Sequence, residues 1–183
     1  PVLRWMVDGG RPEVLVLPRG RPARCSLGDN DHLVIEFAPD GLVRLWDART
    51  GRLLHQLKGH TDVVYSCSFS ADGRLALTVA FDRTARVWDA GTGEPVATLP
   101  CTQAISVAVF DPTGEHVMLS DNSWDLRIVD LSSGENVLLP RDRVGYVGSA
   151  DFGREGRTII TTSATTRAQI RSLPEGTIIA TLV

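Results

Sequence analysis

Residues 59–89 read GHTDVVYSCSFSADGRLALTVAFDRTARVWD, and this stretch decides the fold. It contains three runs rich in Val, Leu, Thr and aromatic residues, at roughly 62–69, 74–80 and 84–89, and a fourth run follows at 95–99. Runs of this composition favour extended strands, and polar pairs such as Asp72-Gly73 between them are typical of tight turns. Nowhere do apolar residues keep a helical period over about ten residues. The sequence therefore predicts an almost entirely β protein.

The third of these runs recurs along the chain at a nearly constant spacing. Val43–Asp47 and Ala85–Asp89 lie 42 residues apart and share Arg, Trp and Asp. Leu126–Asp130 follows 41 residues later, and Ala168–Ser172 lies another 42 residues on. Trp5 stands 41 residues before Trp46, which indicates a partial unit at the start. A repeat of this length is typical of an array of identical supersecondary units.

Two series of glycine turns keep the same period. The first series follows runs that end in Phe, and the second follows the Trp-Asp position of each unit. Their members are Asp72-Gly73, Thr113-Gly114 and Glu155-Gly156, then Thr50-Gly51, Thr92-Gly93, Ser133-Gly134 and Glu175-Gly176. Because tight turns of this composition reverse the chain between strands, each unit is expected to hold four short strands.

A four-stranded unit with Gly59-His60 near its start and Trp88-Asp89 near the end of its third strand resembles the WD-repeat β-propeller family. The resemblance implies one propeller segment over residues 1–183, built from four-stranded antiparallel blades. We expect a partial blade of two strands, near 2–6 and 12–17, followed by four full blades. The expected bounds are 1–17 for the partial blade, then 18–58, 59–100, 101–140 and 141–183. Since propellers of this family usually close with seven blades and the chain starts at Pro1 rather than Met, we expect a piece of a larger ring.

The resemblance also implies a structural tetrad within the best-matching unit. In related proteins a His, a Ser or Thr, an Asp and a Trp form a hydrogen-bonded chain, and these positions fall on His60, Thr78, Asp82 and Trp88. A buried imidazole, hydroxyl and indole N–H each need a partner, so the assignment is physically reasonable. The first unit keeps Trp46 but has Glu36 at the Thr position.

The same residue types could be mistaken for a hydrolase triad. We favour the structural interpretation because each residue coincides with a framework position of the repeat, and the chain has no G-x-S-x-G nucleophile elbow. The remaining histidines do not cluster with carboxylates at metal-ligand spacing, and no phosphate-binding glycine loop is present. We expect no catalytic residues, no cofactor and no metal.

Partner contacts in this family often come from loop positions near the Gly-His histidine and the tight-turn Asp. In the second unit these positions are Val63, Tyr65 and Phe81, and Tyr146 is a matching position in the fourth. Exposed aromatic residues are typical of interface anchors, whereas the alternative is that Val63 and Tyr65 only begin the inner strand and pack between blades. Arg21 and Arg143 fall in loops expected on the same face, where an anionic segment could dock or a solvated rim could lie.

Composition excludes several classes of protein. The net charge of −3, from 19 basic and 22 acidic residues, argues against a nucleic-acid binder, which needs a basic face. No apolar run approaches the roughly 18 to 20 residues that span a bilayer. The three cysteines are dispersed and form no C-x-x-C pair, so they predict free thiols and a cytoplasmic location.

These observations predict a non-enzymatic scaffold that binds a partner protein, or another domain of the same polypeptide, through its loop face. By resemblance, a sensor or regulatory domain of a larger signalling protein is one context. Two alternatives stay open: an accessory propeller of a larger enzyme, and a reader of anions or nucleic acid through the arginine loops. No small-molecule substrate is expected.

Overall fold

The computed structural model describes residues 2–3, 14–15, 24–27, 33–37, 42–47, 50–122, 125–139, 147–163 and 166–182. Within these ranges every regular element is a β-strand, as the sequence predicts. The same ranges contain no helix that could cross a bilayer. The all-β fold class is therefore confirmed.

Sixteen strands form four antiparallel sheets of four strands each, which we call blades 1 to 4. Blade 1 holds β3 (Arg24–Leu27), β4 (Leu33–Phe37), β5 (Val43–Asp47) and β6 (Arg52–Leu57). Blade 2 holds β7 (Val64–Phe69), β8 (Leu75–Ala80), β9 (Thr84–Asp89) and β10 (Pro95–Pro100). Blade 3 holds β11 (Ile105–Phe110), β12 (His116–Asp121), β13 (Leu126–Asp130) and β14 (Asn136–Leu138). Blade 4 holds β15 (Val147–Phe152), β16 (Thr158–Ser163), β17 (Thr166–Ser172) and β18 (Ile178–Thr181).

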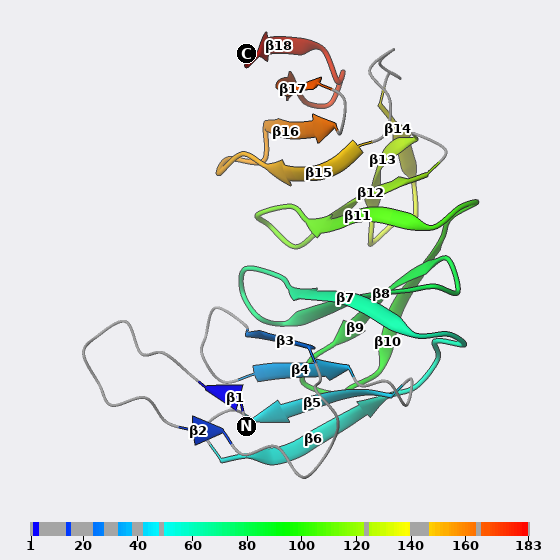
Figure 1. Cartoon of the computed structure of the whole chain (residues 1–183), viewed down its shortest axis with the longest axis vertical. Coiled ribbons are helices and arrows are strands. Elements are labelled where there is room, and N and C mark those ends of the chain that lie inside the picture. Colours follow the sequence, from blue (N-terminus) through cyan, green and yellow to red (C-terminus); the bar gives the residue numbers. More distant parts are fainter. Residues whose placement is uncertain are drawn as a thin grey trace.

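Each blade is a meander in which consecutive strands pair, and the blades follow one another in chain order along the molecule (Figure 1). β3 lies against β7 between blades 1 and 2, β11 lies against β8 between blades 2 and 3, and β11 lies against β15 between blades 3 and 4. Two further strands, β1 (Val2–Leu3) and β2 (Val14–Leu15), pair antiparallel, as predicted for the partial unit. The described sheets are arranged like propeller blades in an open arc and do not close into a ring.

Strand register shows that the units are equivalent copies. Trp46 pairs with Val34 across blade 1, and Trp88 pairs with Ala76 across blade 2. The predicted run at 62–69 begins two residues too early, because the chain bends at Thr61 and Asp62 and β7 starts at Val64.

The hydrophobic core consists of three apolar layers between successive blades. Along β8, Ala76 and Ala80 belong to the layer shared with blade 1, whereas Leu77 and Val79 belong to the layer shared with blade 3. A third layer, which includes Met118 and Ile159, joins blades 3 and 4. Because successive side chains of a strand point to opposite faces, both faces of blades 2 and 3 are buried.

The Asp of each Trp-Asp pair organises the turn that follows it. Asp89 Oδ1 accepts hydrogen bonds from the backbone N–H groups of Gly91 and Thr92, at 2.9 and 2.8 Å. The turn then closes through Gly93, whose N–H donates to the Asp89 carbonyl at 2.8 Å and whose φ is +76°. Asp130 repeats this arrangement in blade 3, where Gly134 has a φ of +74°. Glycine recurs here because other residues are strained in this backbone conformation.

These two glycines allow a matched test of how blades 1 and 2 contact each other. A Cβ at Gly134 would meet nothing within 4 Å, whereas a Cβ at Gly93 would lie 2.7 Å from the His55 side chain of blade 1. We expect Gly134→Ala to lower the free energy of unfolding by about 1 kcal/mol through backbone strain. We expect Gly93→Ala to lower it by roughly 1 to 3 kcal/mol more, because of overpacking. Urea denaturation measures both, and equal losses would contradict the contact.

Candidate functional site

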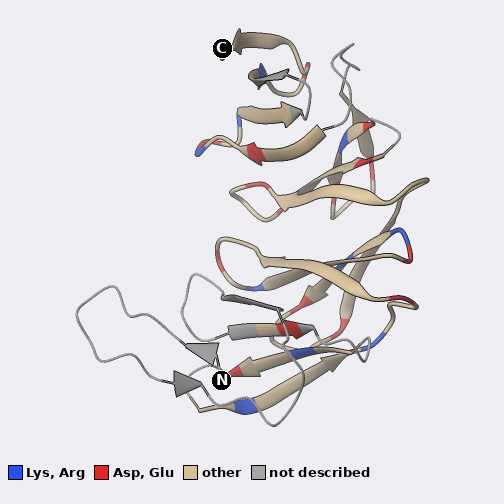
Figure 2. Ribbon diagram, in the orientation of Figure 1, with Lys and Arg blue, Asp and Glu red and all other residues tan. Residues whose placement is uncertain are grey.

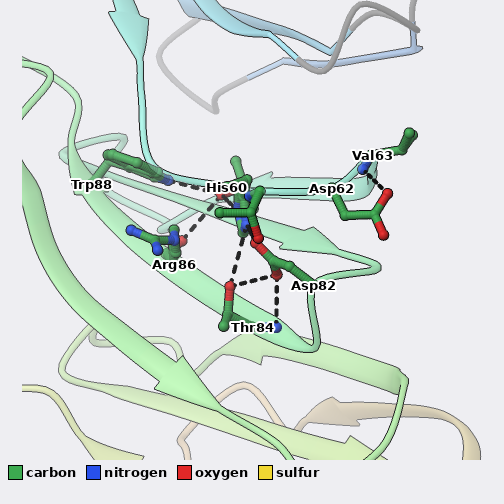
Figure 3. A network of polar contacts seen from close by, with 9 residues as sticks. His60, Asp62, Val63, Asp82, Thr84, Arg86 and Trp88 are labelled. Atoms are coloured by element: carbon green, nitrogen blue, oxygen red, sulfur yellow. Dashed lines mark hydrogen bonds and ion pairs between the residues drawn. The ribbon is translucent and has the colours of Figure 1, made fainter.

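Blade 2 contains a buried chain of hydrogen bonds that joins four side chains. His60 comes from the segment before β7, and its Nδ1 lies 2.8 Å from Asp82 Oδ2 while its Nε2 lies 2.8 Å from Thr78 Oγ1. Trp88 Nε1 donates to the same Thr78 oxygen at 2.8 Å. Figure 3 shows His60 between Trp88 and Asp82. The four residues of the sequence-predicted tetrad are thus brought together in one network, which we call the polar chain.

The chemistry of the donors assigns every proton in the polar chain. The Trp88 indole can only donate, so the Thr78 oxygen accepts from it. The Asp82 carboxylate can only accept, so His60 Nδ1–H donates to it; in a neutral imidazole Nε2 is then unprotonated and accepts from the Thr78 hydroxyl. Each member has its partners, so the imidazole, which is only 2% exposed, is buried without an unpaired nitrogen.

Asp82 ties the polar chain to the loop that carries it. Its carboxylate accepts hydrogen bonds from the backbone N–H of Thr61 at 3.0 Å, from the backbone N–H of Thr84 at 2.9 Å and from the Thr84 hydroxyl at 2.7 Å. Burial alone would raise the pKa of Asp82, but these bonds and the one from His60 outweigh it and lower the pKa to about 2. Burial lowers the pKa of His60, although Asp82 opposes the shift. The polar chain therefore consists of a neutral imidazole and a carboxylate at neutral pH.

This geometry serves structure and not nucleophilic chemistry. The Thr78 residue is 0% exposed, and its hydroxyl is already engaged by Trp88 and His60. A nucleophile must reach a substrate, which this hydroxyl cannot do. Among the described residues, no group of three or more His, Cys, Asp or Glu side chains is placed to hold a metal ion.

Blade 1 satisfies its tryptophan with a different acceptor. Trp46 Nε1 donates to Glu36 Oε2 at 2.8 Å, and both residues are buried. Glu36 pairs with Arg44 across the sheet as Thr78 pairs with Arg86, so the two acceptors occupy equivalent positions. Glu36 departs from the repeat pattern in the sequence, but in the structure its carboxylate replaces the threonine hydroxyl as the acceptor.

Blade 3 dispenses with the tryptophan and keeps the loop anchor. Leu119 and Val129 occupy the positions of Thr78 and Trp88, and both lie in the apolar layer shared with blade 2. Asp121 Oδ2 accepts from the backbone N–H of Thr102 at 3.2 Å and from the Thr102 hydroxyl at 3.1 Å. The Asp121 carboxylate therefore holds the segment before β11, as the Asp82 carboxylate holds the segment before β7.

An exposed apolar patch lies beside the polar chain, at the end of blade 2 where β8 turns into β9. We define it by Val63, Tyr65 and Phe81. The Phe81 N–H donates to the Val63 carbonyl at 3.0 Å, and the rings of Tyr65 and Phe81 lie 4.7 Å apart between centroids. Phe81 is 57% exposed and Val63 is 42% exposed. The three residues selected as partner-binding candidates are thus neighbours.

Tyr65 also connects the patch to the next blade. Its hydroxyl donates to the carbonyl of Ile105 in β11 at 2.5 Å, and its ring packs against the apolar layer between blades 2 and 3. In the structure Tyr65 packs between blades 2 and 3 and its ring lies against Phe81, and its part in partner binding stays a prediction. Tyr146, Arg21 and Arg143, the other predicted partner-binding residues, lie outside the described residues.

Comparisons with known proteins agree with this architecture over part of the chain. Residues 51–89 match the family model described as WD domain, G-beta repeat. A 58-residue segment is 39% identical to Mitochondrial division protein 1 of Saccharomyces cerevisiae (strain ATCC 204508 / S288c); it covers 32% of this chain and 8% of that protein. The protein of the same name in Eremothecium gossypii is 53% identical over 32 residues, or 18% of this chain and 4% of that protein. The matched segment is therefore a small part of these relatives.

Two substitutions separate the contribution of the Thr78 hydroxyl from that of the side-chain volume. Thr78→Val keeps the volume but leaves the Trp88 N–H and one His60 nitrogen without a partner, so we expect the free energy of unfolding to fall by about 1 to 3 kcal/mol per unpaired group. Thr78→Ser keeps the hydroxyl and loses one methyl group, and its loss should be about 1 kcal/mol. Denaturant unfolding of both variants checks this, and a Val variant as stable as the Ser variant would reject the assignment.

The neutral His60 predicts a pH dependence of stability. Its pKa is lower in the folded state than the ordinary value of 6.5, so the unfolded chain binds the proton first. The stabilising contribution is present above pH 6.5 and is lost as the pH falls toward the folded pKa, at no more than about 1.4 kcal/mol per pH unit. Between pH 7 and pH 5 the free energy of unfolding should therefore fall more steeply with decreasing pH for the natural chain than for His60→Gln. An equal pH dependence in both proteins would show that His60 is not the titrating group.

Proposed function

We propose, starting from the WD repeat at residues 51–89, that this chain is a non-enzymatic protein-interaction scaffold that binds a partner protein or a neighbouring domain through its loop face. The observation that carries the proposal is Phe81, which is more than half exposed and held in place. WD repeats generally mediate contacts between proteins, and this role needs only a rigid surface. The finer role of a sensor or regulatory domain in signalling is part of the proposal.

The apolar patch has the properties of an interface anchor. Large aromatic side chains dominate the binding energy of protein interfaces, and an anchor that is already ordered loses little conformational freedom on binding. Phe81 meets both conditions, because its backbone bonds to Val63 and its ring rests on Tyr65, which in turn bonds to blade 3. A partner that covers Phe81 and Val63 would bury apolar surface that is now in water.

The relatives support a scaffold role only at the level of the repeat. Their shared name refers to mitochondrial division, but the aligned segment covers 8% or less of each of the two proteins compared here. The proposal therefore concerns the WD repeat and assigns this chain no part in that process. For location we propose the cytoplasm, and Cys101, which forms no disulfide, supports a reducing compartment.

Phe81→Ala should remove most of the partner affinity without unfolding the blade. Loss of an anchor costs 2 kcal/mol or more, so we expect capture of specifically bound proteins to fall by roughly thirtyfold. The melting temperature should stay nearly unchanged because the Phe81 ring is largely exposed. Quantitative affinity capture from cell extract, with the natural chain and the variant side by side, measures this.

Val96→Ala is the matched control for that experiment. Val96 is 47% exposed on β10 and lies outside the patch, so its loss should leave capture unchanged. Two results would contradict the proposal: equal capture by Phe81→Ala and the natural chain, or an equal loss in both variants.

A further inference from the structure

A concave site lies at the opposite end of the strands from the apolar patch. It is a cavity of about 380 Å³ in the wedge between blades 3 and 4, next to the turns that join β11 to β12 and β15 to β16. This volume falls in the range of pockets that hold small ligands or peptide side chains, which is roughly 300 to 1,000 Å³.

The walls of the cavity are apolar. Ile128, Phe152 and Leu173 line it, and each also packs against the third apolar layer. Val137 of β14 lines the cavity as well and is 48% exposed. The cavity is therefore a place where the core between blades 3 and 4 opens to solvent, and an aliphatic group placed there would lose contact with water.

Carboxylates surround these walls. Asp111, Glu115 and Glu155 line the cavity, and the last two are exposed; Figure 2 shows acidic residues in both adjoining turns. Asp111 is mostly buried and accepts from the Thr113 hydroxyl at 2.7 Å and from the His116 N–H at 3.0 Å. Burial would raise the pKa of Asp111, but these bonds lower it below the ordinary value. Arg154 and Arg157 lie in the β15–β16 turn and do not line the cavity.

His116 keeps the cavity polar on one side. Its Nδ1 lies 3.2 Å from Asp111 Oδ2, and its Nε2 lies 3.7 Å from Asp130 Oδ2. The imidazole thus bridges two carboxylates while its side chain remains 37% exposed. It stands at the mouth with hydrogen-bonding groups that face the acidic turns.

Blade 2 has different side chains at the positions of Glu115 and His116. Leu75 pairs with Asp89 as His116 pairs with Asp130, so the two residues are equivalent, and Leu75 packs against the apolar layer between blades 2 and 3. The residue before it is Arg74, where blade 3 has Glu115. Blade 3 therefore has the anionic Glu115 where blade 2 has the cationic Arg74, and the imidazole of His116 where blade 2 has the apolar Leu75.

We propose that the cavity between blades 3 and 4 binds a lysine side chain of a peptide segment whose neighbouring residues are apolar. The aliphatic stem of lysine packs on apolar surface while its ammonium group stays near charge and water. Glu115 and Glu155 at the rim, with Asp111 deeper in the wall, attract that ammonium group. The walls formed by Ile128, Phe152 and Leu173 match the stem. The volume exceeds what one stem needs, which leaves space for a flanking apolar side chain.

The probe is the blocked peptide acetyl-Leu-Lys-Leu-amide, titrated into the chain while the methyl resonances of Ile128 are followed by NMR. We expect these resonances to shift in a saturable manner. The same peptide with norleucine in place of lysine should bind roughly three- to tenfold more weakly, because it keeps the stem and lacks the charge. No shift at Ile128, or equal affinity of the two peptides, would overturn the proposal. Binding of n-butylammonium chloride as tight as that of the lysine peptide would overturn the peptide assignment in favour of a small organic cation.

One variant copies a residue of blade 2 into blade 3. Glu115→Arg reverses one rim charge and should weaken the lysine peptide more than the norleucine peptide. Glu94→Arg makes the same charge change at an exposed residue away from the cavity and should have no effect. An equal loss with Glu94→Arg would show a general charge effect and reject the site.

Discussion

The inner blades of this protein bury both faces of their sheets, and this constraint governs the rest of the structure. An ordinary antiparallel sheet can place polar residues on a solvated face, but β8 sends Ala76 toward blade 1 and Leu77 toward blade 3. A polar group buried inside such a blade therefore costs free energy unless it finds a partner within the protein. The polar chain of blade 2 meets this requirement in full, because His60, Thr78, Asp82 and Trp88 pair with one another.

Blades 1 and 3 have different residues at the positions of Thr78 and Trp88. Where blade 2 uses the Thr78 hydroxyl to accept from a tryptophan, blade 1 uses the Glu36 carboxylate. Blade 3 replaces both donor and acceptor by apolar residues, which removes the need for the bond. Replacing both partners of a buried hydrogen bond costs little, whereas removing one leaves an unpaired group. This asymmetry explains how units that differ at these positions keep one architecture.

Because neighbouring blades cover both faces of the inner sheets, the loops at the two ends of the blades are the surfaces left for recognition. The apolar patch at one end rests on Tyr65, and Tyr65 is fixed by its bond to Ile105 of the next blade. The cavity at the other end lies between Ile128 of blade 3 and Phe152 of blade 4. Both surfaces are built across a junction of two blades, so their shape depends on how the blades are stacked.

Repeat length, strand order and turn positions were determined by the sequence alone. The spacing of Trp46 and Trp88 and the turn glycines such as Gly93 are local signals, which a chain expresses through strand alternation and backbone conformation. Only the tertiary structure decided that Glu36 accepts from Trp46, that Tyr65 reaches Ile105 and that His116 lines the cavity between blades 3 and 4. These contacts join residues distant in the chain or on different sheets. Their partners are set by the packing of whole blades, which no local pattern encodes.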